Sequence, residues 1–223
     1  MVKDHIAVGM FSAPLRLCSF LERETMSDAR DRNSDTAVPL EKKLDDLYAL
    51  IDGMETAMFT TRRPDGSLVS RAMATQRRTA RADLWFMANW HSEKLDEIAV
   101  DPHVNVSYYR DRTREWVSVS GRAVISRDQN LIRGLYQPDW RAWLGDEGDE
   151  RDGSARDPRI TLILVTADSV TYSKNDRPMP LVLFSVAKAM ITGTPPKVAN
   201  LREVSADELR EGSQRDQEKH INP

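Results

Sequence analysis

Apolar residues in the first part of the chain recur with the period of an α-helix. They follow one another at spacings of four, three and four residues, and so lie on one face of such a helix. Pro39 stands where this helix can begin and Gly53 where it can end. The apolar face would carry Leu40, Leu44, Leu47 and Ile51.

From residue 56 onward the pattern is that of β-strands, in short runs separated by polar turns. A Pro-Asp-Gly turn signal at 64–66 lies between the first two runs and predicts a β-hairpin. Gly121 indicates a bulge or bend in the fifth run, and Asp128 can cap a helix that reaches about Tyr136. The predicted strands cover residues 56–61, 68–76, 83–88, 104–109, 116–126 and 160–172, the last as one strand or two.

These elements predict one β-rich domain of the α+β class, with about six strands and flanking helices. Closing such a sheet into a barrel would remove its exposed edges, so a barrel is the preferred architecture. We expect residues 1–38 to be a disordered leader or an over-extended start, with Met26 as an alternative first residue. The domain would cover residues 39–193, with a helix at 181–190, and residues 194–223 would be a charged, disordered tail with a transient helix around residues 206–212.

Composition excludes several classes of function. Hydrophobic residues make up 40% of the chain, enough for a core, and the formal net charge of −3 argues against a basic nucleic-acid binder. The single cysteine, Cys18, permits no intrachain disulfide and is in keeping with a reducing, cytoplasmic location. No apolar run approaches the roughly 18 to 20 residues that span a bilayer, so we expect no membrane partner.

The sequence carries no common catalytic signature. Gly-rich phosphate loops, the H-E-x-x-H zinc motif and the G-x-S-x-G nucleophile elbow are all absent. The four histidines, His5, His91, His103 and His220, are scattered without metal-site spacing. We therefore expect no bound metal and no nucleophilic hydrolase, and we name no catalytic residue.

A polar junction, "NWHSEKLDEI" at residues 89–98, carries a candidate site for an anion. Ser92 can cap the helix that follows, and the first turn of a helix presents free backbone N–H groups to a phosphate. Lys94 adds a formal positive charge there. Arg71 lies among small residues in "SRAMATQ", where an arginine needs an anion or an exposed surface. The simpler alternatives, a surface helix cap and two solvated charges, remain open from these residues alone.

Three segments follow one another in a characteristic order: "SRAM", then "LWFMANWHSEKLDEIAVDPHVNVSYY", then "WVSVSGRAVI". Over residues 40–193 the chain thus resembles the pyridoxamine 5′-phosphate oxidase-like FMN-binding split β-barrel proteins, above all their bacterial general stress protein branch. The resemblance implies a six-stranded split β-barrel that forms a homodimer, with FMN bound at each end of the subunit interface.

The resemblance also implies which residues bind the cofactor. Arg71 would bind the FMN phosphate together with Ser92 and Lys94, in agreement with the helix-end argument. The residues that follow Arg71 would line the isoalloxazine and ribityl groups, two later strand residues would form the opposite wall, and three tryptophans would make aromatic contacts. The first set is Ala72, Met73, Ala74, Thr75 and Gln76, the second is Met87 and Ala88, and the third is Trp116, Trp140 and Trp143, the last two as lids from the partner subunit.

Departures from the family pattern argue against pyridoxamine phosphate oxidation. Glu93 stands where the oxidases have an arginine, and Gln76 stands where they have a substrate-binding lysine. Their C-terminal arginine motif has no counterpart in this chain. The expected function is that of an FMN-binding general-stress-type protein, with flavin-dependent oxidoreductase activity on an unidentified small molecule as an open question.

Three alternatives also remain open. Related split barrels use the deazaflavin F420 or handle haem and its products, and the same fold can hold flavin without catalysis. The third is a barrel that binds single-stranded nucleic acid through arginines and aromatic residues, which the net negative charge opposes, so no nucleic acid is expected. The arginines in question are Arg62, Arg63, Arg77 and Arg78.

Overall fold

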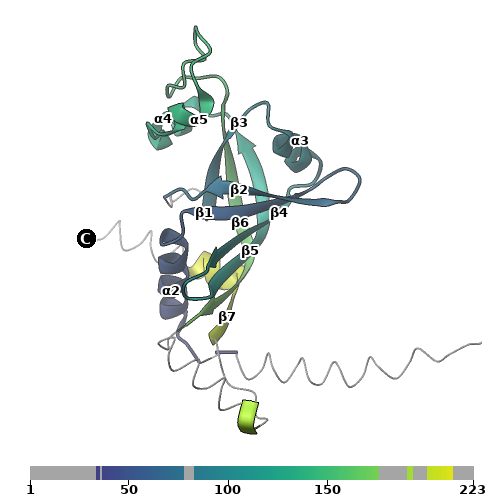
Figure 1. The fold of residues 1–223 in the computed structure, drawn as a ribbon, viewed down its shortest axis with the longest axis vertical. Coiled ribbons are helices and arrows are strands. Elements are labelled where there is room, and N and C mark those ends of the chain that lie inside the picture. The colour runs from purple at the N-terminus through teal and green to yellow at the C-terminus, as the bar shows by residue number, and fades with distance from the viewer. Residues whose placement is uncertain (1–33, 36, 78–82, 176–189, 193–199, 213–223) are drawn as a thin grey trace, which may run out of the picture.

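The computed structural model describes residues 34–35, 37–77, 83–175, 190–192 and 200–212. The leader predicted at the N-terminus and the helix predicted at 181–190 lie almost wholly outside these residues. Within them the fold is an antiparallel sheet of seven strands with helices on its flanks (Figure 1). The predicted β-rich class with flanking helices is therefore confirmed.

The sheet runs in the order β2-β1-β4-β5-β6-β3, and β7 pairs with β6 outside this path. The strands are β1 (Thr56–Arg62), β2 (Leu68–Ala74), β3 (Leu84–Asn89), β4 (His103–Arg110), β5 (Glu115–Ser126), β6 (Ile160–Lys174) and β7 (Asn200–Ser205). The helices are α2 (Leu40–Asp52), α3 (Glu93–Val100), α4 (Gln129–Leu135) and α5 (Trp140–Leu144). The segment predicted as one strand or two is thus the single long strand β6.

The sheet is not closed into a ring. One edge of β6 pairs with β5, whereas its other edge pairs with β3 over its first half and with β7 over its second half. In the part of the chain that the structure describes, β2 pairs only with β1 and leaves an open edge. The split-barrel class is confirmed, but the expectation that closure removes the edges is wrong, because β6 carries two separate strands on one side.

The main core lies between α2 and the inner face of the sheet. Alternation along β1 buries Ala57 and Phe59, while their strand neighbours face outward. The predicted apolar face of α2 is confirmed, since Leu44, Leu47 and Ile51 are buried in this core. Local periodicity therefore determines how both elements pack.

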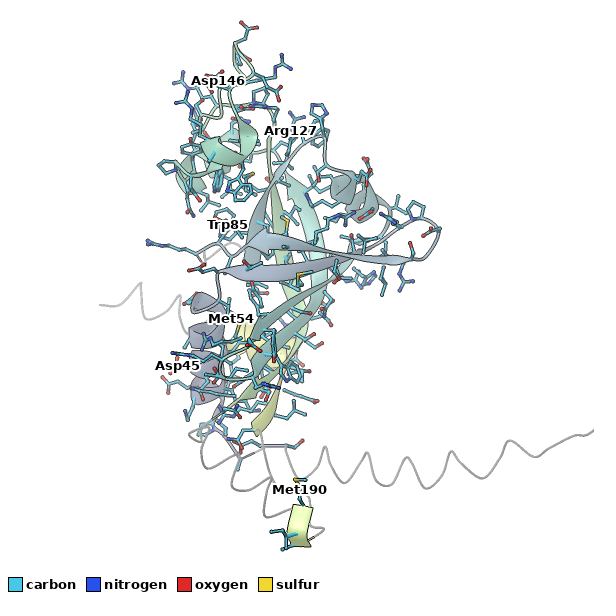
Figure 2. All side chains as sticks on the ribbon, viewed as in Figure 1. Asp45, Met54, Trp85, Arg127, Asp146 and Met190 are labelled. Atoms are coloured by element: carbon cyan, nitrogen blue, oxygen red, sulfur yellow. The ribbon has the colours of Figure 1, made fainter. Side chains whose placement is uncertain are left out.

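A second, smaller core lies on the opposite face of β3, against α4 and α5. Trp85 belongs to it, whereas the next residue, Phe86, belongs to the main core, because successive strand residues face opposite sides. The ring of Trp140 from α5 packs edge-to-face on Trp85, with 6.0 Å between the ring centroids. Figure 1 shows α4 and α5 together at one end of the molecule, and Figure 2 marks Asp146 in the loop beyond them.

The prediction of a disordered tail is wrong for residues 200–205, which form β7 beside β6. Residues 206–212 are helical, where the sequence predicts a transient helix, and Leu209 is buried. The side chain of Arg202 is 2% exposed and pairs with Asp46 of α2 and with Asp35. A charged composition does not exclude an ordered strand here, because the buried charge has carboxylate partners from distant parts of the chain.

Two local signals read from the sequence are confirmed. The register between β5 and β6 shifts between Ser120 and Gly121, which is the predicted bulge. Asp128 caps α4, since its carboxylate accepts from the backbone N–H groups of Asn130 and Leu131 at 2.8 and 3.3 Å. Glycine is required at the bulge, because an added Cβ would lie 2.3 Å from the carbonyl oxygen of Thr166.

Replacing Gly121 by alanine should lower the free energy of unfolding by about 2–4 kcal/mol, because the new methyl group would collide with the backbone of β6. Chemical denaturation followed by circular dichroism measures this change. Gly134→Ala in α4 is the control, because nothing lies within 4 Å of a Cβ added there. This substitution should raise the free energy of unfolding by about 0.5–1 kcal/mol, since alanine favours the helix more than glycine does. An unchanged denaturation midpoint for Gly121→Ala would contradict the backbone contact.

Candidate functional site

Arg71 of β2, Thr61 of β1 and Glu97 of α3 form a hydrogen-bonded cluster. Arg71 donates from Nη1 to Thr61 Oγ1 and to Glu97 Oε2, both at 2.9 Å, and from Nη2 to Glu97 Oε1 at 2.8 Å. The Thr61 hydroxyl donates in turn to Glu97 Oε2. Arg71 stands opposite Phe59 in the β1–β2 pairing, so its side chain lies on the same face as that of Thr61. The cluster therefore connects three elements at the open edge of the sheet.

Ser92 and Lys94 meet at the N-terminal end of α3. Ser92 occupies the N-cap position, and its carbonyl accepts from the backbone N–H of Leu95 at 2.9 Å. Its hydroxyl makes no capping hydrogen bond and instead accepts one from Lys94 Nζ at 2.5 Å. The prediction that the Ser92 side chain caps the helix is therefore wrong, and the N–H groups of the first turn have no side-chain acceptor from this residue.

Positive charge is in excess in this cluster. Burial lowers the pKa of Lys94 and the nearby Arg71 lowers it further, whereas Glu97 acts in the opposite direction. The hydrogen bond from Arg71 is the main cause of the lowered pKa of Glu97. Arg63 is a further cation, with its Nε 3.5 Å from Glu97 Oε1. One buried carboxylate thus faces three cationic side chains, and the remaining positive charge favours an anion.

The predicted ring-binding residues follow Arg71 along the open edge strand. Ala72 and Ala74 are exposed on its outer face, whereas Met73 is half-buried against the main core. The outer face of the strand is exposed and its inner face is only partly covered, because its residues alternate between exposed and half-buried positions. Its small outer side chains leave room for a flat group or for another protein surface.

The two residues after β2 are tied to other parts of the fold. Among the residues that the structure describes, neither the buried Thr75 hydroxyl nor that of Tyr108 has a hydrogen-bond partner. Burial raises the pKa of Tyr108, and the neighbouring Thr75 hydroxyl acts against this effect. Gln76 accepts a hydrogen bond from Gln137 Nε2 at 2.9 Å, which connects the end of β2 with the segment between α4 and α5.

Met87 and Ala88, predicted to form one wall together, point to opposite faces of β3. Ala88 is buried in the main core, and Met87 is half-buried against the second core. The two side chains are separated because they are neighbours in one strand. Of the pair, Ala88 shares the inner face of the sheet with Arg71.

The three predicted tryptophans have different environments. Trp116 of β5 is half-buried, and in the strand pairing it stands opposite Tyr109 and Ser173. Trp140 is 1% exposed in the second core, which leaves it almost no surface for a ligand or a partner subunit. Trp143 is 78% exposed, so its role as a lid stays a prediction.

Sequence reasoning missed Glu97, which organises the cluster. Glu97 is buried on the inner face of α3 together with Leu95 and Ile98. A carboxylate among apolar neighbours on a helix requires a cation or hydrogen-bond donors close by, and this was the available signal. The partner is Arg71, which lies 26 residues away, so only the fold reveals the pair.

Neither a metal centre nor a membrane span is found in the described residues. No group of three or more His, Cys, Asp or Glu side chains there is arranged to hold a metal ion. Of the helices in the same residues, none is long and apolar enough to cross a membrane.

The pyridoxamine 5′-phosphate oxidase-like family matches residues 42–197, which include the cluster and all the predicted cofactor-binding residues. The chain belongs to this family. Among curated proteins, protein bli-3 of Neurospora crassa is 38% identical over 184 residues, which cover 81% of this chain and 88% of that protein.

Solved structures of general stress proteins are similar to this chain in fold. A putative general stress protein 26 from Jannaschia sp. CCS1 has a TM-score of 0.56 and 18% identity, over 74% of this chain and 99% of that one. A second structure is that of a protein from Nostoc punctiforme PCC 73102, described as pyridoxamine 5′-phosphate oxidase-related and FMN binding. Its TM-score is 0.44 and its sequence identity is 16%, over 72% of this chain and 86% of that one. At 18% identity the likeness to the Jannaschia protein concerns the fold alone.

The Arg71–Glu97 pair should make stability depend on pH in the acid range. The pKa of Glu97 is lowered in the folded state, so its contribution is fully present above the ordinary value near 4.5 and is lost as the pH falls through the folded-state pKa. Urea unfolding between about pH 3 and 7 should therefore show a difference between wild type and Glu97→Gln that shrinks on acidification. Asp96→Asn, at an exposed site of α3, is the control. A difference that stays constant with pH would contradict the ion pair.

Proposed function

We propose that this protein binds FMN, with the phosphate held by Arg71, Ser92 and Lys94. The observation that carries the proposal is the excess of positive charge where the end of α3 meets β2. Lys94 and Arg71 are close enough to repel each other, and a phosphate between them would relieve this repulsion. The first turn of α3 would add backbone N–H groups and the positive end of the helix dipole. The family resemblance supports the same three residues.

The ring of FMN would lie along the outer edge of β2. Exposed Ala72 and Ala74 are small enough for a planar group to approach the backbone there. When bound, FMN would supply the redox chemistry, and the protein would hold and orient it. Trp140 and Met87 take no part in this proposal, because their side chains belong to the second core.

The proposal extends to FMN binding and leaves catalysis as a further question. Glu93 and Gln76 depart from the oxidase pattern, which argues against pyridoxamine phosphate as substrate. None of the residues around the cluster has the character of an obligatory acid or base. A flavin-dependent oxidoreductase and a non-catalytic flavin-binding stress protein are both compatible with such a site.

The exposed outer face of the sheet supports a homodimer as part of the same proposal. Met58, Leu68 and Tyr109 are 43%, 67% and 58% exposed, and the strand register places them on one face. Exposed apolar side chains gathered on one face of a sheet mark an interaction surface. A second copy of the chain would cover this face and the open edge beside it.

Purified protein should take up FMN and become yellow, with absorbance that is released on denaturation. Titrations with FMN, riboflavin, F420 and haem should show that FMN binds most tightly, because only FMN unites a flavin ring with a simple terminal phosphate. Lys94→Glu should weaken FMN binding about a hundredfold, since it reverses the charge at the phosphate. The control is Arg210→Glu. It also reverses a positive charge, but on a side chain that is 69% exposed and far along the chain from Lys94. Protein that stays colourless with added FMN would refute the proposal.

Light scattering on the purified protein should give the mass of a dimer, about twice the 25.4 kDa of the chain. Met58→Asp should shift the population toward monomers, because it places a charge on the covered face. Val100→Asp is the matched control, at an apolar residue on α3 that is 66% exposed. A monomeric mass at high protein concentration would contradict this assembly.

A further inference from the structure

The guanidinium of Arg71 is only partly used by its own chain. Glu97 and Thr61 together engage both hydrogens of Nη1 and one hydrogen of Nη2. An arginine has five N–H groups in a plane, so the hydrogen on Nε and the second one on Nη2 remain. Among the described residues, none accepts a hydrogen bond from Nε. These two N–H groups lie parallel on one edge of the guanidinium, which is the geometry that binds two oxygens of a phosphate.

Glu97 determines which edge of Arg71 remains available. Its carboxylate takes the end of the guanidinium, with one oxygen on each Nη atom, and it is itself 5% exposed and bound by the Thr61 hydroxyl. Because this carboxylate is buried and hydrogen-bonded, it is held in one position and restricts the guanidinium of Arg71 to one orientation. Without it, Arg71 would stand on an open edge strand and could turn toward solvent, because its side chain is already 22% exposed.

We propose that Glu97 is a positioning residue of the flavin site, which holds Arg71 so that its Nε–Nη2 edge faces the phosphate. This inference rests on the proposed binding of FMN. Folding would then supply the ordering of the arginine side chain, which otherwise costs conformational entropy at the moment of binding. The negative charge of Glu97 opposes a phosphate, but its hydrogen bonds and its contact with Arg63 largely neutralise it.

Positioning and simple electrostatics predict opposite results for one variant. Glu97→Gln removes a negative charge near the site, so electrostatics alone predicts tighter binding of FMN. Positioning predicts that FMN binds about tenfold more weakly, because the amide cannot accept from both Nη atoms. Riboflavin has no phosphate, so its affinity should change less than about twofold. Asp96→Asn removes the same charge from an exposed position of α3 and should not weaken FMN binding.

A double-mutant cycle separates positioning from a general structural role. If Glu97 acts through Arg71, then Glu97→Gln should change FMN affinity less than about twofold in an Arg71→Ala background. Thr61→Val is a milder second variant, which removes one acceptor from Nη1 and should weaken FMN binding about threefold while sparing riboflavin. If Glu97→Gln does not fold, the threonine variant decides.

The results that overturn the inference differ from those that overturn the proposed function. Wild-type protein that binds no FMN refutes both. Wild-type protein that binds FMN, with unchanged or tighter binding by Glu97→Gln, refutes the positioning role alone. The positioning role is also refuted if Glu97→Gln weakens riboflavin binding as much as FMN binding. It is refuted as well if Glu97→Gln still weakens FMN binding in the Arg71→Ala background. If Glu97→Gln does not fold, unchanged FMN binding by Thr61→Val refutes the positioning role.

Discussion

The ion pair between Arg71 and Glu97 is the interaction on which the arrangement of the site depends. Glu97 lies on the buried side of α3, where an unpaired carboxylate would be costly, and Arg71 provides its charged partner. The pair ties the middle of α3 to the edge strand β2. Lys94 is thereby brought close to Arg71 and into partial burial. A structural requirement of one carboxylate thus creates a region with unbalanced positive charge.

The junction between β3 and α3 is held from several directions. The backbone N–H of Trp90 donates to the carbonyl of Arg159 at 2.7 Å, and Asn89 Oδ1 accepts from the backbone N–H of His91 at 2.9 Å. The guanidinium of Arg127 lies over the ring of Trp90, 4.3 Å from its centroid. Because β3 is also buried by a core on each face, α3 begins at a well-defined place relative to the sheet.

The regular elements were largely predictable because their signals are local. The apolar face of α2, the alternation of β1 and the cap at Asp128 each depend on residues within a few positions of one another. The strand around Arg202 was not predictable in this way, since its charges are compensated by Asp46 and Asp35, far away in the sequence. Average composition describes exposure poorly when ion pairs form across the fold.

The sequence by itself determined the β-rich class and the family resemblance, and it predicted three residues for a phosphate, because residue type and spacing are enough for each inference. Only the tertiary structure decided how those residues are used. It directs the Ser92 hydroxyl to Lys94 instead of the helix end, and it buries Trp140 in a second core. It also joins Arg71 to Glu97. The burial of Trp140 and the pairing of Arg71 with Glu97 depend on contacts between segments that are distant along the chain, and neither periodicity nor local chemistry carries that information.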